Sequence, residues 1–176
     1  MSLSALELVD KAVREATVWH SANLPPNPSP PKISFLPTPA VSTCQTDGAW
    51  HAHSQIGGMG WIIQNPQGKV IIKNSSVRHF VSSAIVAEAL AILAALCEAA
   101  SLEIRQLHLQ SDSEILINTL VTVLERIEIA GILTDIRSLE HLFSSLSFSF
   151  IPQSANCVAN GLAKSAILAL SPLGPL

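Results

Sequence analysis

The sequence predicts a mixed α/β domain in which three antiparallel strands are followed by parallel strands that alternate with helices. Its 176 residues are 48% hydrophobic, which is enough to bury one core. Three stretches of β character come first, within residues 41–80, and shorter apolar stretches then alternate with helical ones up to residue 170. A strand that follows a helix needs a right-handed crossover, so the later strands are expected to lie parallel.

The N-terminal part of the chain is expected to lie outside this domain. Residues 1–22 place apolar side chains near helical spacing, which predicts a short amphipathic helix. Residues 23–40 are rich in proline and predict an extended linker. The domain itself is therefore expected at 41–170, with a C-terminal tail at 171–176.

The first half of the domain is expected to form an antiparallel meander. The first strand spans Val41–Trp50 and is predicted to carry Asp47 to its end. Two further segments of β character, 57–64 and 69–80, flank the turn motif Asn65-Pro66-Gln67-Gly68. Strands joined by short turns lie antiparallel, so these three segments are predicted to be neighbours in one sheet.

The second half of the domain alternates helices with strands. Ser82 or Ser83 can cap a helix, and residues 104–110 follow it as a buried strand. The motif Ser111-Asp112-Ser113-Glu114 matches a capping box, which predicts that a second helix begins there. A helix over about 131–145, a short strand around 148–151 and a last helix over 156–170 complete the domain.

The composition of the chain argues against some classes of function and some locations. The formal net charge of -3 speaks against a protein that holds nucleic acid by electrostatics alone, because such domains are usually basic. The three cysteines are odd in number and follow no metal-ligand spacing, which favours a reducing compartment. The N-terminus lacks an apolar signal core, and polar residues interrupt the longest uncharged run, 142–163. We therefore expect an intracellular protein, nuclear or cytoplasmic, without membrane association.

Three acidic residues occupy unusual positions and are the candidate catalytic and metal-binding residues. Asp47 stands just before a glycine, Glu88 interrupts an apolar helical run, and Asp112 follows the buried strand. If their elements are neighbours, three carboxylates meet, and cations must offset their repulsion; oxygen ligands select Mg²⁺ or Mn²⁺. Two such ions about 4 Å apart can activate water and stabilise the leaving oxygen of a phosphodiester. Taken singly, the same acids fit a turn, a solvated helix face and a helix cap.

Five short motifs occur in one order along the chain. They are Thr46-Asp47-Gly48-Ala49-Trp50, Gly58-Met59-Gly60-Trp61, Ala87-Glu88-Ala89-Leu90-Ala91, Ser111-Asp112-Ser113 and 155–164. In this order they resemble the type 1 ribonuclease H family, in particular a plant branch similar to the ribonuclease H part of non-LTR retrotransposons. The resemblance covers about Thr43 to Ile167. It implies a five-stranded mixed sheet flanked by helices, and cleavage of the RNA strand of RNA-DNA hybrids.

The resemblance also implies a set of four acids that bind two Mg²⁺ ions. Asp47 would bridge both ions, and Glu88 and Asp112 would hold one of them. The family's last acid falls on Asn160, so the fourth catalytic and metal-binding position is occupied by a neutral side chain. Such a ligand still offers one oxygen, but it removes a negative charge from the ion that should position the attacking water.

Contacts to nucleic acid are expected from a few residues. Gly48, Ser113 and Lys164 are the candidates, and Lys164 follows Asn160 by one helical turn. The last loop of the family often carries two arginines, where this chain has Gln153 and Cys157. Two cations expected beside the site are therefore absent from the sequence.

Several aromatic and histidine side chains have two interpretations. Trp50, Trp61 and Phe80 could stack on bases, but core positions are favoured, above all for Trp61. His51 and His53 could resemble a zinc pair, yet no third ligand has suitable spacing, so exposed loop positions are favoured.

Three functions remain open from the sequence. The first is a Mg²⁺-dependent endonuclease that hydrolyses RNA in RNA-DNA hybrids. The second is a domesticated, catalytically impaired module that binds nucleic acid, because the fourth acid is Asn160. The third is a protein-interaction domain, favoured by the acidic balance and the N-terminal helix. The expected partner is an RNA-DNA hybrid or another nucleic acid, and the chain is expected to be a monomer.

Overall fold

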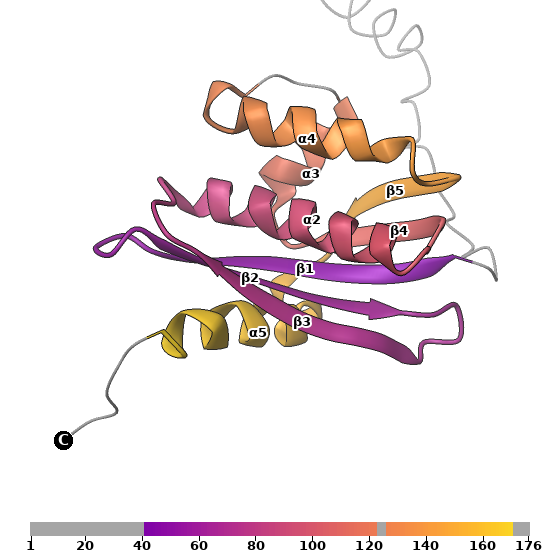
Figure 1. The fold of residues 1–176 in the computed structure, drawn as a ribbon, viewed down its shortest axis with the longest axis horizontal. Coiled ribbons are helices and arrows are strands. Elements are labelled where there is room, and N and C mark those ends of the chain that lie inside the picture. The colour runs from indigo at the N-terminus through magenta and orange to yellow at the C-terminus, as the bar shows by residue number, and fades with distance from the viewer. Residues whose placement is uncertain (1–40, 123–125, 171–176) are drawn as a thin grey trace, which may run out of the picture. The chain divides into compact units, whose positions relative to one another are not determined.

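The computed structural model describes residues 41–122 and 126–170. The predicted N-terminal helix (1–22), the proline-rich linker (23–40) and the tail (171–176) lie outside these residues. The elements are β1 (Ser42–His51), β2 (Ile56–Gln64), β3 (Val70–Arg78), α2 (Ala84–Ser101), β4 (Gln106–Ser111), α3 (Glu114–Thr122), η1 (Ile127–Ile129), α4 (Ala130–Glu140), β5 (Ser145–Phe150), η2 (Gln153–Ala155) and α5 (Cys157–Leu168). Their order is the one that the sequence predicts (Figure 1).

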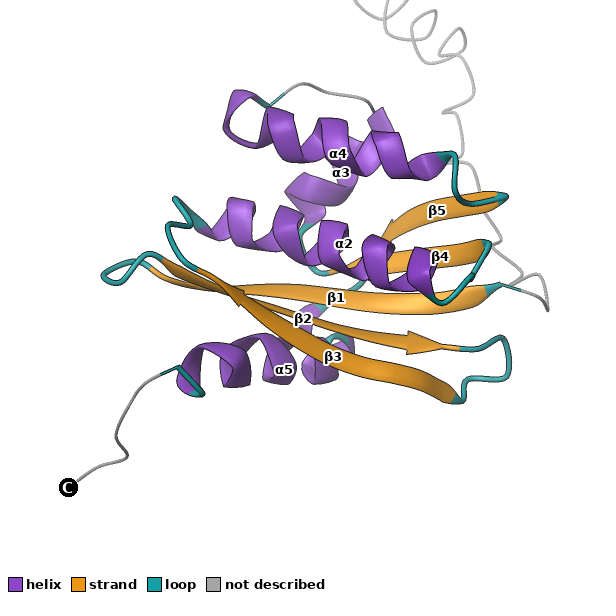
Figure 2. Ribbon diagram, viewed as in Figure 1, coloured by secondary structure: helices purple, strands orange, loops and turns teal. Residues whose placement is uncertain are grey.

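One five-stranded mixed sheet forms the centre of the domain, with strand order β3-β2-β1-β4-β5 (Figure 2). The pairs β1–β2 and β2–β3 are antiparallel, as expected for a meander. The pairs β1–β4 and β4–β5 are parallel, because a helical crossover precedes each of the two later strands. The expected fold class is therefore confirmed.

Helices cover both faces of the sheet. In Figure 1, α2, α3 and α4 lie on one side and α5 lies on the other. α2 packs on β1 and β2, while α5 packs on β2, β1 and β3. The buried face of α2 consists largely of alanine, which lets the helix lie close to the sheet. α2 is also long and apolar enough to cross a membrane, but half of it is buried inside the domain, so it serves here as a core helix.

Two boundaries differ from the sequence prediction. The capping box at 111–114 does not form, because Ser111 belongs to β4, where it pairs with Phe150 of β5. Its hydroxyl oxygen instead accepts the N–H of Ser113 at 3.1 Å, and α3 begins at Glu114. α4 ends at Glu140 instead of near Ser145, because Ser145 pairs with Gln106 as the first residue of β5. In both places pairing between strands outweighs a local helical preference.

Candidate metal centre

Two of the three acids lie at the end of the parallel ladder between β1 and β4. Thr46 and Ser111 are the last residues that pair across these strands. The next residue on each side is an aspartate, Asp47 and Asp112. This register places both carboxylates at the same edge of the ladder, which is where ligands collect in sheets of this kind.

Asp47 does not lie at the end of its own strand, and that part of the sequence prediction is wrong. β1 continues to His51 because β2 remains paired with it, and Asp47 itself pairs with Gly60. β1 extends several residues beyond its last pair with the parallel strand β4. Asp47 is consequently held by strand pairing on one side, is only 6% exposed, and faces the end of β4 on the other.

Glu88 reaches the same place from the second turn of α2. The N–H of Gly48 donates a hydrogen bond to Oε2 of Glu88 at 3.1 Å. A Cβ atom at Gly48 would lie 2.4 Å from the backbone N of Glu88, so no side chain fits there. The absence of a side chain at Gly48 therefore lets α2 approach β1 closely enough to place Glu88 beside Asp47.

A second close approach positions α5 on the opposite face. A Cβ at Gly60 would lie 2.4 Å from the carbonyl oxygen of Ala159, and one at Gly58 would lie 2.1 Å from that of Ala163. These two glycines let α5 lie directly against β2. Asn160 and Lys164, which lie one helical turn apart on α5, are thereby carried to the site.

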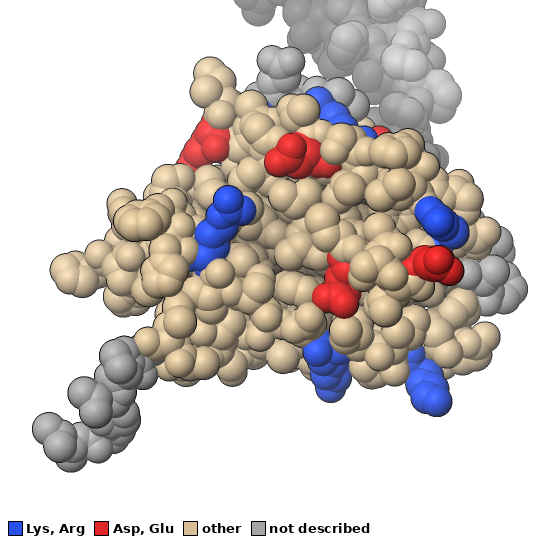
Figure 3. All heavy atoms as spheres, in the orientation of Figure 1, with Lys and Arg blue, Asp and Glu red and all other residues tan. Residues whose placement is uncertain are grey.

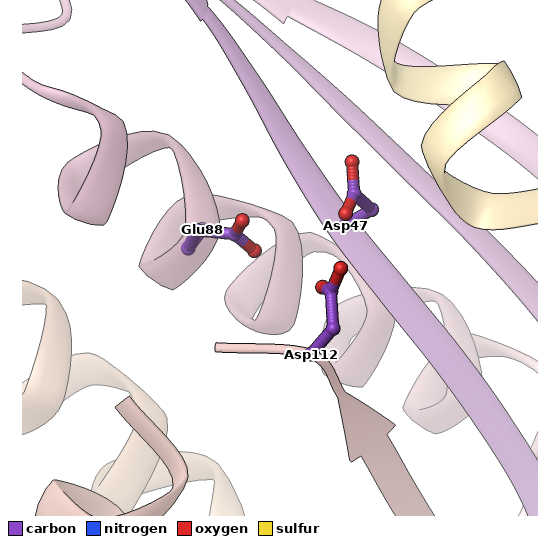
Figure 4. Close-up of side chains that lie close together, drawn as sticks. All are labelled: Asp47, Glu88 and Asp112. Carbon is purple, nitrogen blue, oxygen red and sulfur yellow. The ribbon is translucent and has the colours of Figure 1, made fainter. Parts of the chain in front are cut away.

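The three carboxylates converge as expected. Asp47, Glu88 and Asp112 each offer one oxygen, and these oxygens lie within 4.8 Å of one another. Figure 4 shows the three side chains pointing toward one another from β1, α2 and the residue after β4. The alternative of three unrelated acids on a turn, a helix face and a cap is excluded by this geometry.

Burial and mutual repulsion raise the pKa of two of the three carboxyl groups. Burial raises the pKa of Asp47, and the neighbouring Asp112 raises it further, while Lys164 acts in the opposite direction. Burial raises the pKa of Glu88 to about 8, with added repulsion from Asp47 and Asp112 and partial relief from the Gly48 N–H. A bound cation would remove this repulsion. The set of oxygen ligands suits a hard divalent ion such as Mg²⁺ or Mn²⁺.

A cavity of about 530 Å³ opens beside the cluster. Asn160, Lys164 and Gly48 line it together with the three acids, as the sequence predicted for one site. Ser113 does not line it and lies at the start of α3, where its carbonyl oxygen accepts the N–H of Ile117.

Asn156 belongs to the site, although the sequence analysis did not select it. Its side chain is completely buried, and its Nδ2 donates to the carbonyl oxygen of Thr46 at 2.9 Å and to Oδ1 of Asp112 at 3.0 Å. A longer contact of 3.5 Å reaches Oδ1 of Asp47. The signal that could have revealed it is its position four residues before Asn160, inside the motif 155–164.

The aromatic and histidine residues fall into two groups. Trp61 is 4% exposed and belongs to the core, as predicted, and His51 and His53 are exposed. Trp50 is half-buried, and its indole N–H donates to the carbonyl oxygen of Val81 at 2.8 Å. Phe80 is 90% exposed, so the core interpretation is wrong for this residue. Phe80 lies between β3 and α2 and has a φ of +61°.

The surface charge agrees with the composition. On the face shown in Figure 3, basic and acidic side chains of the described residues lie scattered among each other, and the basic ones do not gather into one patch. Lys73 and Arg78 of β3 are exposed. Lys164 is therefore the described cation with the clearest relation to the candidate centre.

Comparisons with known proteins agree with this fold. Residues 45–166 match the family described as reverse transcriptase-like, and the chain belongs to this family. No curated protein sequence matches the chain. The fold is that of ribonuclease H1.

Several solved structures resemble this chain over most of their own length. Ribonuclease H1 from Halobacterium salinarum NRC-1 is 22% identical, with 73% of this chain and 98% of that chain covered and a TM-score of 0.69. LC11-RNase H1, isolated from compost and solved with an RNA/DNA hybrid, is 22% identical over 74% of this chain and 99% of that chain, with a TM-score of 0.67. A foamy viral protease-reverse transcriptase in complex with dsDNA is 14% identical over 74% and 95%, with a TM-score of 0.60. Membership of the narrower plant retrotransposon branch stays a prediction.

Proposed function

We propose that this chain is a ribonuclease H-like domain that binds nucleic-acid duplexes and hydrolyses the RNA strand of RNA-DNA hybrids with Mg²⁺. The observation that supports it most is the convergence of Asp47, Glu88 and Asp112, whose oxygens lie within 4.8 Å of one another. The structural similarity to a ribonuclease H1 bound to an RNA/DNA hybrid supports the choice of substrate.

Four residues are proposed to bind the cation. Asp47, Glu88 and Asp112 would bind it, and Asn160 would add a neutral oxygen from α5. Bound divalent ions would supply an activated water and charge stabilisation for the leaving oxygen. The Gly48 N–H holds one oxygen of Glu88, so this carboxylate is oriented by the backbone before any ligand arrives.

The cavity determines how a substrate could approach. Its lining includes Ile167, Leu168, Trp50 and Lys164. Lys164 can contact a phosphate next to the scissile bond, because it lines the same cavity as Asp47. Gln153 stands where the family often has an arginine, and Lys164 is the one lysine or arginine among the described lining residues. The substrate is therefore expected to bind weakly.

A second candidate function is a nucleic-acid-binding module with impaired cleavage. Asn160 favours it, because this half-buried residue lines the cavity and adds no charge. With a neutral fourth ligand, any further ion beside Asp47 is held by fewer negative charges. Cleavage is therefore expected to be slower than in a site with four acids.

The test is cleavage of an end-labelled RNA-DNA hybrid by the full chain with Mg²⁺, with Asp47→Asn prepared in parallel. Cleavage that depends on Mg²⁺ and disappears in Asp47→Asn supports the proposal. Fluorescence anisotropy with the same hybrid in EDTA measures binding separately. Binding without cleavage supports the impaired module, and the absence of both points to the protein-interaction alternative. Double-stranded RNA and DNA of the same sequence test the choice of duplex.

A further inference from the structure

Asn156 occupies a helix-capping position without capping the helix. It is the N-cap residue of α5, and its side chain makes no cap hydrogen bond. Asparagine is favoured at this position because its side-chain oxygen usually accepts an N–H of the first helical turn. Here the side chain turns inward to the carboxylates and is completely buried. The local structure of α5 therefore does not explain why this residue is asparagine.

The surroundings of the amide define its orientation. The carbonyl oxygen of Thr46 and one oxygen each of Asp47 and Asp112 lie around Nδ2. All three are acceptors, so only the NH₂ group can face them. The amide oxygen of Asn156 is left buried, with no hydrogen-bond partner among the described residues. Buried polar atoms are nearly always paired, so an orphaned one calls for a compensating role of the side chain.

We propose that Asn156 is a positioning residue of the metal centre. Its amide ties the carboxylates of Asp47 and Asp112 to the start of α5, and it thereby sets the spacing of the oxygens that receive the cation. This inference rests on the proposed function, because it assumes that the cluster binds divalent ions. The donor engages Oδ1 of each aspartate, so each carboxylate keeps its other oxygen free of this contact.

The backbone of Asn156 extends the same role to the fourth candidate ligand. Its carbonyl oxygen accepts the N–H of Asn160 at 3.0 Å, in the first turn of α5. One residue therefore links β1, the end of β4 and the helix that carries Asn160 and Lys164. Loss of the amide would release Asp47 and Asp112 from α5 without removing any of the three carboxylates.

The test is Mn²⁺ affinity, measured by isothermal titration calorimetry on the full chain and on Asn156→Ala and Asn156→Leu. Leucine keeps the branched shape of asparagine but has no donor. Both variants are expected to bind Mn²⁺ about 10- to 100-fold more weakly, as is typical when a group that orients a metal ligand is lost. In hybrid cleavage we expect kcat to fall while KM for the hybrid stays nearly constant.

Thr119→Ala is the matched control for stability. Thr119 is buried on α3, and its hydroxyl donates to the carbonyl oxygen of Ile115 at 2.7 Å, so its loss also removes a buried hydrogen bond. We expect a lower melting temperature with unchanged Mn²⁺ affinity. If the folded Asn156 variants bind Mn²⁺ as tightly as the wild type, the inference is overturned, whatever happens to cleavage.

A measurement on the wild type keeps the inference testable if both variants unfold. The side-chain amide NMR signals of Asn156 should shift on addition of Mg²⁺, while those of the exposed Asn118 on α3 should not. Unchanged Asn156 signals at saturating Mg²⁺ would overturn the positioning role. A wild type that binds Mn²⁺ but leaves hybrids intact contradicts the proposed nuclease function alone, and the role of Asn156 is then judged on ion affinity.

Discussion

The backbone N–H of Gly48 donates a hydrogen bond of 3.1 Å to the side-chain carboxylate of Glu88, and this contact exists because Gly48 has no side chain. A Cβ would lie 2.4 Å from the carbonyl carbon of Ala87, well inside any allowed separation. Gly48 was expected to touch nucleic acid, and the structure gives it a packing role at the centre as well. The distance between α2 and β1, and with it the position of Glu88, depends on this residue.

Gly48→Ala is expected to destabilise the fold and to displace Glu88 from the candidate metal centre. The added methyl group meets helix backbone, which cannot rotate away, so we expect a loss of about 1–3 kcal/mol or more in the free energy of unfolding. Urea unfolding measures this loss. The control is Gly161→Ala on α5, where nothing lies within 4 Å of the new Cβ and a gain of up to about 1 kcal/mol is expected. Equal effects of the two changes would contradict the packing role.

The raised carboxyl pKa values predict how stability depends on pH. The pKa of Glu88 is raised from 4.5 to about 8, and that of Asp47 is also raised, so between these values the folded chain binds protons that the unfolded chain has released. The free energy of unfolding of the metal-free protein should therefore fall as the pH rises across this range.

A divalent ion should reverse this loss, because it compensates the carboxylate charges that the higher pH creates. Thermal unfolding with and without Mg²⁺ should show a larger rise in melting temperature at about pH 8 than at about pH 6. In Asp47→Asn the rise should shrink at both values. An equal effect of Mg²⁺ at the two pH values would contradict the electrostatic origin.

Asn160→Asp is expected to raise Mg²⁺-dependent hybrid cleavage. It places a charged ligand at the cavity, one turn before Lys164, and leaves the packing of α5 against Gly60 unchanged. We expect a gain of about 10- to 100-fold or more, measured as initial rate. The gain should disappear in the Asp47→Asn background. A wild type that already cleaves vigorously and does not respond would show that a neutral ligand suffices.

Lys164 should account for much of the weak affinity for nucleic acid. Each phosphate contact contributes about 0.9 to the slope of log affinity against log salt, and we expect fewer than roughly four contacts. Lys164→Ala should weaken hybrid binding and make the slope shallower, as measured by anisotropy at several salt concentrations. Lys73→Ala on the exposed strand β3 is the matched control and should change neither. A steep slope in the wild type would contradict this prediction.

Removal of residues 1–40 should leave the domain folded. Every helix and strand that the structure describes lies between Ser42 and Leu168. A chain that begins at Val41 is therefore expected to melt within a few degrees of the full chain in calorimetry. A large drop in melting temperature would place the domain boundary earlier than the sequence predicts.

The order of strands and helices could be predicted because each element shows its own periodicity and its own turn signals. The convergence of Asp47, Glu88 and Asp112 could be predicted because parallel strands bring their ends to one edge. The position of Asp47 within the strand was misjudged. The predicted strand Val41–Trp50 nearly matches β1, but Asp47 lies inside it, because β2 stays paired with β1 as far as His51.

Asn156 shows a different limit of sequence analysis. An asparagine just before a helix predicts a cap, and only the packed structure shows that its side chain serves two aspartates instead. Phe80 was expected in the core, yet its side chain is 90% exposed. For Asn156, a local preference is overridden by elements that are distant in sequence.

The link between Asn156 and the two aspartates determines when the centre can arise during synthesis of the chain. Asp47, Glu88 and Asp112 are made well before Asn156, so a partly synthesised chain holds the three acids without the amide that ties two of them together. The complete set of contacts appears only after α5 has left the ribosome and docked on β2. Tight Mn²⁺ binding by the proposed centre is therefore expected only after the last helix has docked on the sheet.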